Sequence, residues 1–293
     1  MTQSRGLAAS LAAKSAHFAR LIKVEHSLYA LPFAYAGAFL ALGRTPSRHD
    51  LIWITIAMVG ARSAAMALNR LIDAGLDARN PRTQGRELPS GVLARGEVIL
   101  FTVLSVAVLV IASFHLSEPC RYLWPIPVAA FVFYPYAKRF TALCHYILGL
   151  TDGLAPAAAW VAVTGEVSWP PVLLFLAVGL WVGGFDVIYA LLDVEFDRRE
   201  GVHSIPVSIG EKGAFWVAGV SHLLAVVLLV AVGVFLDLPA VYYAGCGAVA
   251  AMLAWSDLDV AIHGIERTGM RFMTVNSVVG VVYGAVAVVA VLS

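Results

Sequence analysis

Long apolar segments alternate with short polar ones along almost the whole chain. Each apolar segment is continuous rather than alternating residue by residue, and has about the 20 residues needed to cross a hydrocarbon core. In lipid, every backbone polar group needs a partner within its own segment, so these segments are predicted to be helices. The pattern predicts an all-α integral membrane bundle of about nine transmembrane helices. They are expected near 21–42, 51–72, 97–116, 119–136, 143–163, 170–192, 213–236, 238–256 and 271–292.

The composition also indicates that lipid is the main solvent of this protein. Hydrophobic residues make up 60% of the chain and charged residues 13%, and the mean hydropathy is +0.82, above the apolar share of a soluble domain. The net charge of +1 gives no reason to expect a nucleic-acid partner. The scattered cysteines indicate neither a disulfide framework nor a zinc site. We expect no removable signal peptide, because a short apolar segment with a cleavage site is missing at the N-terminus.

Basic residues are distributed unevenly between the two sides of the predicted bundle. If the N-terminus is inside, 16 of the 20 Lys and Arg residues fall in cytoplasmic segments and three on the opposite face. Short cytoplasmic loops of membrane proteins carry this excess of basic residues. The chain is therefore predicted to be a multi-pass protein of the cell inner (cytoplasmic) membrane, with its N-terminus and active site facing the cytoplasm.

Two polar segments, 69–91 and 186–204, are longer and more charged than the others and resemble each other. Asp73 and Asp77 align with Asp193 and Asp197 at a constant offset of 120 residues. This similarity predicts a degenerate internal repeat within a single domain. The single domain is expected to cover 1–293, with halves at about 21–136 and 143–256 and a last helix at 271–292.

The oxygen-bearing side chains of these two segments are predicted to form two stripes. On an α-helix, steps of four residues advance by only about 40°, and a step of seven by about 20°. Residues at these spacings therefore share one face of a helix. The stripes comprise Asn69, Asp73 and Asp77 in the first half, and Asp186, Asp193 and Asp197 in the second.

Gathering so many carboxylates at these positions is unfavourable without a cation. Both stripes fall at C-terminal helix ends, where a carboxylate is disfavoured by about 0.3–1 kcal/mol. An ionised group just inside the membrane costs up to about 2.5–3.5 kcal/mol. Oxygen-only ligands favour Mg²⁺, which is usually held by one or two carboxylates together with substrate phosphates. We therefore predict a Mg²⁺-bridged diphosphate held by nearby arginines, although solvated topology-determining loops remain the alternative. The arginines are Arg79, Arg82, Arg86, Arg198 and Arg199.

These residues resemble the signatures of the UbiA superfamily of intramembrane aromatic prenyltransferases over nearly the whole chain. The first signature, N-x-x-x-D-x-x-x-D, starts at Asn69 and is followed by L-P-S-G at 88–91. A Y-P-x-x-K-R motif starts at Tyr134, and a tyrosine precedes the second D-x-x-x-D. Two departures exist. The family's N-R-P-L-P-S-G reads G-R-E-L-P-S-G here, and His203 replaces a frequent lysine, which weakens its expected diphosphate contact at neutral pH.

The resemblance implies helices around a central apolar cavity, capped by cytoplasmic loops, with Mg²⁺ at the mouth. An allylic diphosphate would ionise there, and an aromatic carbon would attack the carbocation. The implied metal ligands are Asn69, Asp73, Asp77, Asp193 and Asp197. Lys138 and the loop arginines would stabilise the departing diphosphate, and the rings of Tyr134 and Tyr189 would shield the cation. Asp186 and His203 complete the expected substrate-binding residues.

Arg62 lies inside the second span, seven residues before Asn69. Family members that act on hydroxybenzoate-like acceptors carry an arginine at this place, so the resemblance implies that Arg62 binds the acceptor carboxylate. The alternative is a buried ion pair with Asp152 or Asp186.

Six other histidines are expected to be isolated and without chemistry. Two acids near the end of the eighth span are expected to be interfacial, with Arg267 and Arg271 as neighbours. The histidines are His17, His26, His115, His145, His222 and His263, and the acids are Asp257 and Asp259.

The predicted function is Mg²⁺-dependent transfer of a polyprenyl group from a polyprenyl diphosphate to an aromatic acid in quinone biosynthesis. The acceptor is 4-hydroxybenzoate, as for ubiquinone, or a dihydroxynaphthoate, because 195–206 resembles the menaquinone branch that proceeds through futalosine. A tetrapyrrole or glycerol-phosphate lipid acceptor remains open. An ion-coupled transporter is disfavoured, because its acidic groups are expected near the bilayer midplane rather than at one face.

Overall fold

The computed structural model describes residues 14–22 and 24–293, and within these ranges the chain contains helices and no strand. The polar segment joining α3 to α4 is the longest connection between major helices. The elements are α2 (Val24–Leu42), α3 (Arg48–Asp77), α4 (Arg95–Phe114), α5 (Cys120–Leu123), α6 (Pro125–Ala137), α7 (Cys144–Thr164), α8 (Trp169–Tyr189), the 3₁₀ turn η1 (Ala190–Asp193), α9 (Val194–Glu200), α10 (Ile205–Phe235), α11 (Ala240–His263) and α12 (Ile265–Leu292).

Seven helices of the described ranges are long and apolar enough to cross a membrane, which confirms the predicted helical membrane bundle. They are α3, α4, α7, α8 with its continuation, α10, α11 and α12. The described apolar part of α2, Leu31–Leu42, is shorter, and α6 has 13 residues. The exact count of nine spans stays a prediction.

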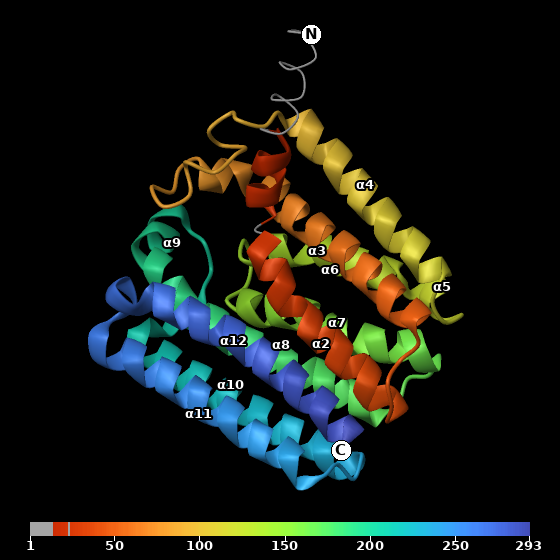
Figure 1. Ribbon diagram of the computed structural model, residues 1–293. Helices are drawn as coiled ribbons and strands as arrows, with labels where there is room; N and C mark the ends of the chain where they lie inside the picture. Colours follow the sequence, from red (N-terminus) through yellow and green to blue (C-terminus); the bar gives the residue numbers. More distant parts are fainter. Residues whose placement is uncertain (1–13, 23) are drawn as a thin grey trace, which may run out of the picture.

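The long helices pack side by side along a common diagonal direction (Figure 1). The α7 and α8 pair, the α8 and α10 pair, and α12 against α2 and α11 make the main contacts of one side. Glycine permits the close approach of α7 and α8, since a methyl group at Gly149 would lie 2.1 Å from the carbonyl oxygen of Gly179. Small residues let helix backbones approach in this way in membranes. Apolar residues of α2, α7, α8, α10, α11 and α12 form the largest core cluster.

The two acidic segments end differently. The helix α3 continues unbroken through Asp77, whereas α8 ends at Tyr189 and the chain passes through the 3₁₀ turn η1 into α9. The prediction that Asp186 shares one continuous α-helical stripe with Asp193 is therefore wrong, because a 3₁₀ turn has a different angular step per residue. The segment after α3 and the short helix α9 lie at the same end of the bundle, at the upper left of Figure 1.

Candidate active site

A polar cavity of about 350 Å³ lies at this end of the bundle. Its wall combines residues of α3, α6, α7, α8, α9 and the segment between α3 and α4. The structure thus brings the two acidic segments, far apart in sequence, to one space. The wall includes all five predicted metal ligands, Asn69, Asp73, Asp77, Asp193 and Asp197.

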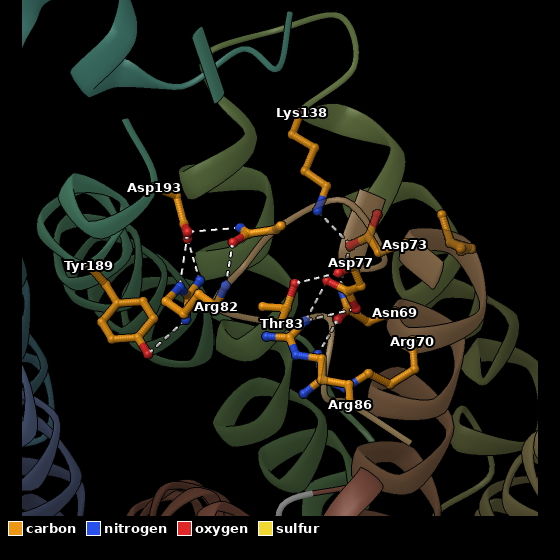
Figure 2. Close-up of polar contacts among 12 residues, drawn as sticks. Asn69, Arg70, Asp73, Asp77, Arg82, Thr83, Arg86, Lys138, Tyr189 and Asp193 are labelled. Carbon is orange, nitrogen blue, oxygen red and sulfur yellow. Dashed lines mark hydrogen bonds and ion pairs between the residues drawn. The ribbon is translucent and has the colours of Figure 1, made fainter. Parts of the chain in front are cut away.

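Asp73 is almost completely buried and is bound by two basic side chains. Lys138 Nζ lies 2.6 Å from Asp73 Oδ2, and Arg139 Nη2 lies 3.2 Å from Oδ1. The Asn69 amide also donates to Asp73 Oδ2 at 3.2 Å. Both cations follow α6, so the Y-P-x-x-K-R motif places positive charge against the first acidic segment. Figure 2 shows the Lys138 contact.

Asp77 is held by the segment that directly follows it. Arg86 Nη1 donates to both carboxylate oxygens, at 2.7 and 2.9 Å. The buried Thr83 hydroxyl donates to the Asp77 main-chain carbonyl at 3.1 Å. These contacts hold residues 78–94 against the end of α3. The segment belongs to the first half of the chain and forms part of the cavity wall.

The same segment reaches Asp193 in the second half (Figure 2). Arg82 donates to both oxygens of Asp193, with Nε at 2.9 Å, and Asn80 Nδ2 donates at 3.0 Å. Burial acts to lower the pKa of Arg82, but its hydrogen bonds to Asp193 outweigh that effect and hold the pKa above its ordinary value. The guanidinium also lies 5.5 Å from the ring centroid of Tyr189. A charged Arg82 therefore links the two acidic segments.

Asp197 and Asp186 lack basic arginine or lysine partners in the described part of the chain. Asp186 instead contacts His145 Nδ1 at 2.7 Å, and the backbone N–H of Ile205 points at His145 Nε2 at 3.3 Å. Because Nε2 accepts, Nδ1 carries the proton that is shared with Asp186. The expectation that His145 is isolated is wrong.

A second histidine and acid pair lies away from the cavity. His222 Nδ1 on α10 is 2.6 Å from Asp257 Oδ2 on α11, so the expectation that His222 is isolated is also wrong. Asp259 contacts Arg271, its expected neighbour, at 3.1 Å. It also contacts His263 at 2.9 Å, so the expectation that His263 is isolated is wrong as well. Sequence spacing cannot reveal the His222 pair, because its members are 35 residues apart on different helices.

Several predicted substrate contacts fall at the cavity wall and three do not. The wall includes Tyr134, Tyr189, Arg86 and His203. Arg79 is not part of the wall and pairs with Glu200 at 2.7 Å. Arg198 and Arg199 are exposed on α9 and are also absent from the wall. The phosphate contacts assigned to these three arginines therefore stay predictions that need a movement of the side chains.

The donor chemistry of the cavity fits a hard divalent ion. All five predicted ligands offer oxygen, the donor that Mg²⁺ prefers. Within the described ranges, no three His, Cys, Asp or Glu side chains stand close enough together to form one metal site. Arg82, Arg86 and Lys138 bind the carboxylates instead. For a metal ion to bind there, these basic side chains would have to leave the carboxylates and contact the phosphates of the substrate.

Arg62 forms the ion pair that the sequence offered as an alternative. Its Nη1 lies 3.3 Å from Asp152 Oδ1, whereas its Nε is buried without a hydrogen-bond partner. The Asp186 partner considered for Arg62 is not found, since Asp186 contacts His145. One guanidinium nitrogen, Nη1, is thus engaged by the protein, while the buried Nε–H has no partner among the described residues.

An apolar cavity of about 240 Å³ adjoins the polar one. The two share part of their walls, including Arg62, Asp152 and Phe185. A further apolar cavity of about 330 Å³ continues from the first and shares Ala155 and Ala158 with it. Together they form a polar mouth followed by an apolar path deep between α3 and α7.

Four residues that matter in this geometry were missed in the sequence or named only as alternatives: Asn80, Arg139, His145 and Asp152. The Asn80-Pro81 pair is a turn signal, and Asn80 does accept the Arg82 N–H at 2.9 Å. Arg139 was visible as the last residue of the Y-P-x-x-K-R motif. His145 and Asp152 carry no local signal, because their partners come from other helices.

Known proteins resemble this chain over most of its length. Residues 30–278 match the model of the UbiA prenyltransferase family. A 4-hydroxybenzoate octaprenyltransferase of Aliivibrio fischeri strain MJ11 is 30% identical over 253 residues, 85% of this chain and 86% of that protein. The apo structure of a UbiA homolog from Aeropyrum pernix K1 superposes with a TM-score of 0.83 at 31% identity, covering 90% of this chain and 98% of that one. A UbiA homolog from Archaeoglobus fulgidus, solved with DMAPP and Mg²⁺, shares the fold at 17% identity and a TM-score of 0.65, covering 93% and 99%.

Proposed function

Because the chain belongs to the UbiA prenyltransferase family and is a multi-pass membrane prenyltransferase, we propose that it transfers a polyprenyl group to an aromatic carboxylic acid. The observation that carries this proposal is the polar cavity, rich in carboxylates and cations, that opens into an apolar one. A polyprenyl diphosphate has the same two parts, a charged head and an apolar chain.

In this proposal the basic residues of the mouth bind the diphosphate. Lys138, Arg82 and Arg86 line the cavity and hold carboxylates in the structure. Lys138 and the arginines would stabilise the negative charge that develops on the diphosphate as its C–O bond breaks. The apolar walls exclude water, so that the allylic cation reacts with the aromatic ring rather than with solvent.

Asn69 and the four aspartates of the two signatures would hold Mg²⁺, directly or through water. The all-oxygen donor set and its place in one cavity support this assignment. When bound, Mg²⁺ supplies charge neutralisation for the diphosphate. The Archaeoglobus fulgidus homolog was solved with Mg²⁺ and DMAPP, which supports the same requirement here.

The acceptor proposed is 4-hydroxybenzoate or a dihydroxynaphthoate. Relatives named 4-hydroxybenzoate octaprenyltransferase support the first acceptor. Both acids carry a carboxylate, which suits the free Nε of Arg62 at the junction of the two cavities. In the inner membrane, with the polar mouth toward the cytoplasm, the enzyme would take both substrates from the cytoplasmic side, as the distribution of basic residues predicts.

The test uses the purified full chain in lipid with a polyprenyl diphosphate and Mg²⁺. The acceptors are 4-hydroxybenzoate, a dihydroxynaphthoate, a tetrapyrrole and glycerol phosphate. We expect a prenylated aromatic acid by mass spectrometry, together with released diphosphate. Prenylation of only the tetrapyrrole or the glycerol phosphate, or solute uptake driven by an ion gradient without prenylation, would contradict the proposal.

A further inference from the structure

The wall shared by the polar and the apolar cavity marks the place where bond formation occurs, if the function proposed above holds. The diphosphate belongs to the polar side and the chain to the apolar side, so the first carbon of the prenyl group lies between them. The acceptor ring must lie within reach of that carbon. Seven residues line both cavities: Arg62, Ala65, Thr151, Asp152, Val182, Phe185 and Met273.

Among these seven residues, Asp152 is the only acid. Its carboxyl side chain is 36% exposed, and because it lines both cavities, this exposed part faces the space where the ring would lie. A single contact of 3.3 Å joins it to Arg62. Asp152 therefore has oxygen lone pairs that no contact with the protein uses.

Prenylation of an aromatic ring needs a group that accepts a proton. The C–O bond of the allylic diphosphate breaks, and its electron pair leaves with the diphosphate. A pair of ring π electrons forms the new C–C bond and leaves a cationic ring. Aromaticity returns when the C–H bond at the same carbon breaks, its electron pair stays in the ring and the proton moves to a base. A positioned carboxylate typically contributes about 10²–10⁴-fold to such a transfer.

The other carboxylates of the polar cavity are less suited to this role. Asp73, Asp77 and Asp193 are bound by lysine or arginine side chains and belong to the proposed metal site. Asp197 also belongs to the proposed metal site and lines only the polar cavity. Asp186 contacts His145 and likewise lines only the polar cavity. These acids are therefore on the diphosphate side of the reacting carbon.

We propose that Asp152 accepts the proton that the aromatic ring loses, while Arg62 holds both Asp152 and the acceptor carboxylate. Nη1 of Arg62 contacts Asp152, and the guanidinium, which lines both cavities and whose Nε has no partner in the described protein, would bind the acceptor carboxylate. One guanidinium thus sets the distance between the base and the ring. In this proposal Asp152 is the base, and Arg62 both binds the acceptor and positions Asp152.

A kinetic isotope effect tests the proposal. We compare 4-hydroxybenzoate with its ring-deuterated form, using the full chain in lipid, and also the Asp152→Asn and Asp186→Asn variants. In the wild type we expect proton loss to follow a slower step, so that the two forms react at the same rate. Asp152→Asn should lower kcat by about 10²-fold or more and make the deuterated acceptor clearly slower than the normal one, because proton loss now limits the rate.

The matched variant and a rescue separate this role from a structural one. Asp186→Asn removes the neighbouring acid and should lower turnover without an isotope effect. Asp152→Glu keeps a carboxylate and should recover part of kcat. Thermal unfolding checks that the variants fold, and if Asp152→Asn does not, Asp152→Ser gives the same isotope comparison.

Each result decides between the two proposals. Wild-type turnover by Asp152→Asn, or a slow variant with no isotope effect, overturns the role of Asp152 and leaves the proposed function intact. A wild-type protein that prenylates no aromatic acid overturns the proposed function and the role of Asp152 with it.

Discussion

The two acidic helix ends carry related sequences but differ in how they are held. At the end of α3, a continuous helix presents both Asp73, which Lys138 and Arg139 bind, and Asp77, which Arg86 binds. At the end of α8, the helix breaks into η1 and α9, and Asp193 depends on Arg82 from the other half of the chain. Both ends use long-range contacts, but only the first end keeps its acids on one unbroken helix.

This difference assigns a linking role to residues 78–94. The segment contacts Asp77 through Arg86 and Asp193 through Arg82 and Asn80, so it joins both acidic ends over one cavity. A substrate that draws these arginines to its phosphates would release both ends at once. We expect the backbone at the end of α8 to move more easily than the end of α3, because the helix is already interrupted there by η1.

The largest expected effect comes from removing one acid from each end. Asp73→Asn and Asp193→Asn should each abolish prenyl transfer, because both carboxylates belong to the proposed metal site. Both variants should stay folded, but Asp73→Asn should have the lower melting temperature, since it leaves two cations without their acid. Turnover assays and thermal unfolding measure this. Wild-type turnover in either variant would contradict the shared role of the two ends.

A smaller effect is expected from cutting the link between the ends. Arg82→Ala removes the contact to Asp193 and should lower kcat/KM by about 10–100-fold, in the range of lost charge-assisted hydrogen bonds of about 1.5–3 kcal/mol. Arg82→Lys keeps the charge but loses the two-point contact, so it should recover only part of the activity. Arg79→Ala is the matched control, because Arg79 lies outside the cavity wall. An equal loss in Arg79→Ala would show that the positive charge of the segment matters more than its contacts.

Arg62→Ala should affect one substrate. We expect the KM for the acceptor acid to rise by about tenfold, as for one lost charge-assisted contact, with little change in the KM for the prenyl diphosphate. The reason is that Arg62 lies at the cavity junction, deeper along α3 than the acidic end. Steady-state kinetics with each substrate varied in turn give the two values. Equal changes in both would contradict the acceptor-binding role.

The smallest expected effect tests the backbone at the two ends. Gly201 ends α9 with φ = 70°, whereas Gly75 lies within α3, and neither has an atom within 4 Å of an added Cβ. Gly201→Ala should destabilise the protein by about 1 kcal/mol because of its left-handed backbone, and Gly75→Ala should stabilise it by about 0.5–1 kcal/mol. Reversible unfolding in detergent measures both. A destabilising Gly75→Ala would contradict a regular, unstrained helix at the end of α3.

The sequence determined the membrane class and much of the mouth of the site. Apolar segments of spanning length can be recognised locally because lipid requires each segment to satisfy its own backbone. The D-x-x-x-D spacing likewise predicts neighbours on one helix face, and this holds for Asp73 and Asp77 on α3. The seven-residue step from Asp186 to Asp193 does not keep one face in the same way, because the chain between them leaves the α-helix at η1.

Only the tertiary structure decided which charge meets which. Arg82 with Asp193, His145 with Asp186 and Arg62 with Asp152 are separated by 111, 41 and 90 residues. No local pattern encodes such pairs, since they depend on which helix faces meet across the cavity. The same is true of the wall shared by the polar and apolar cavities, which exists only once α3, α7 and α8 have packed around it.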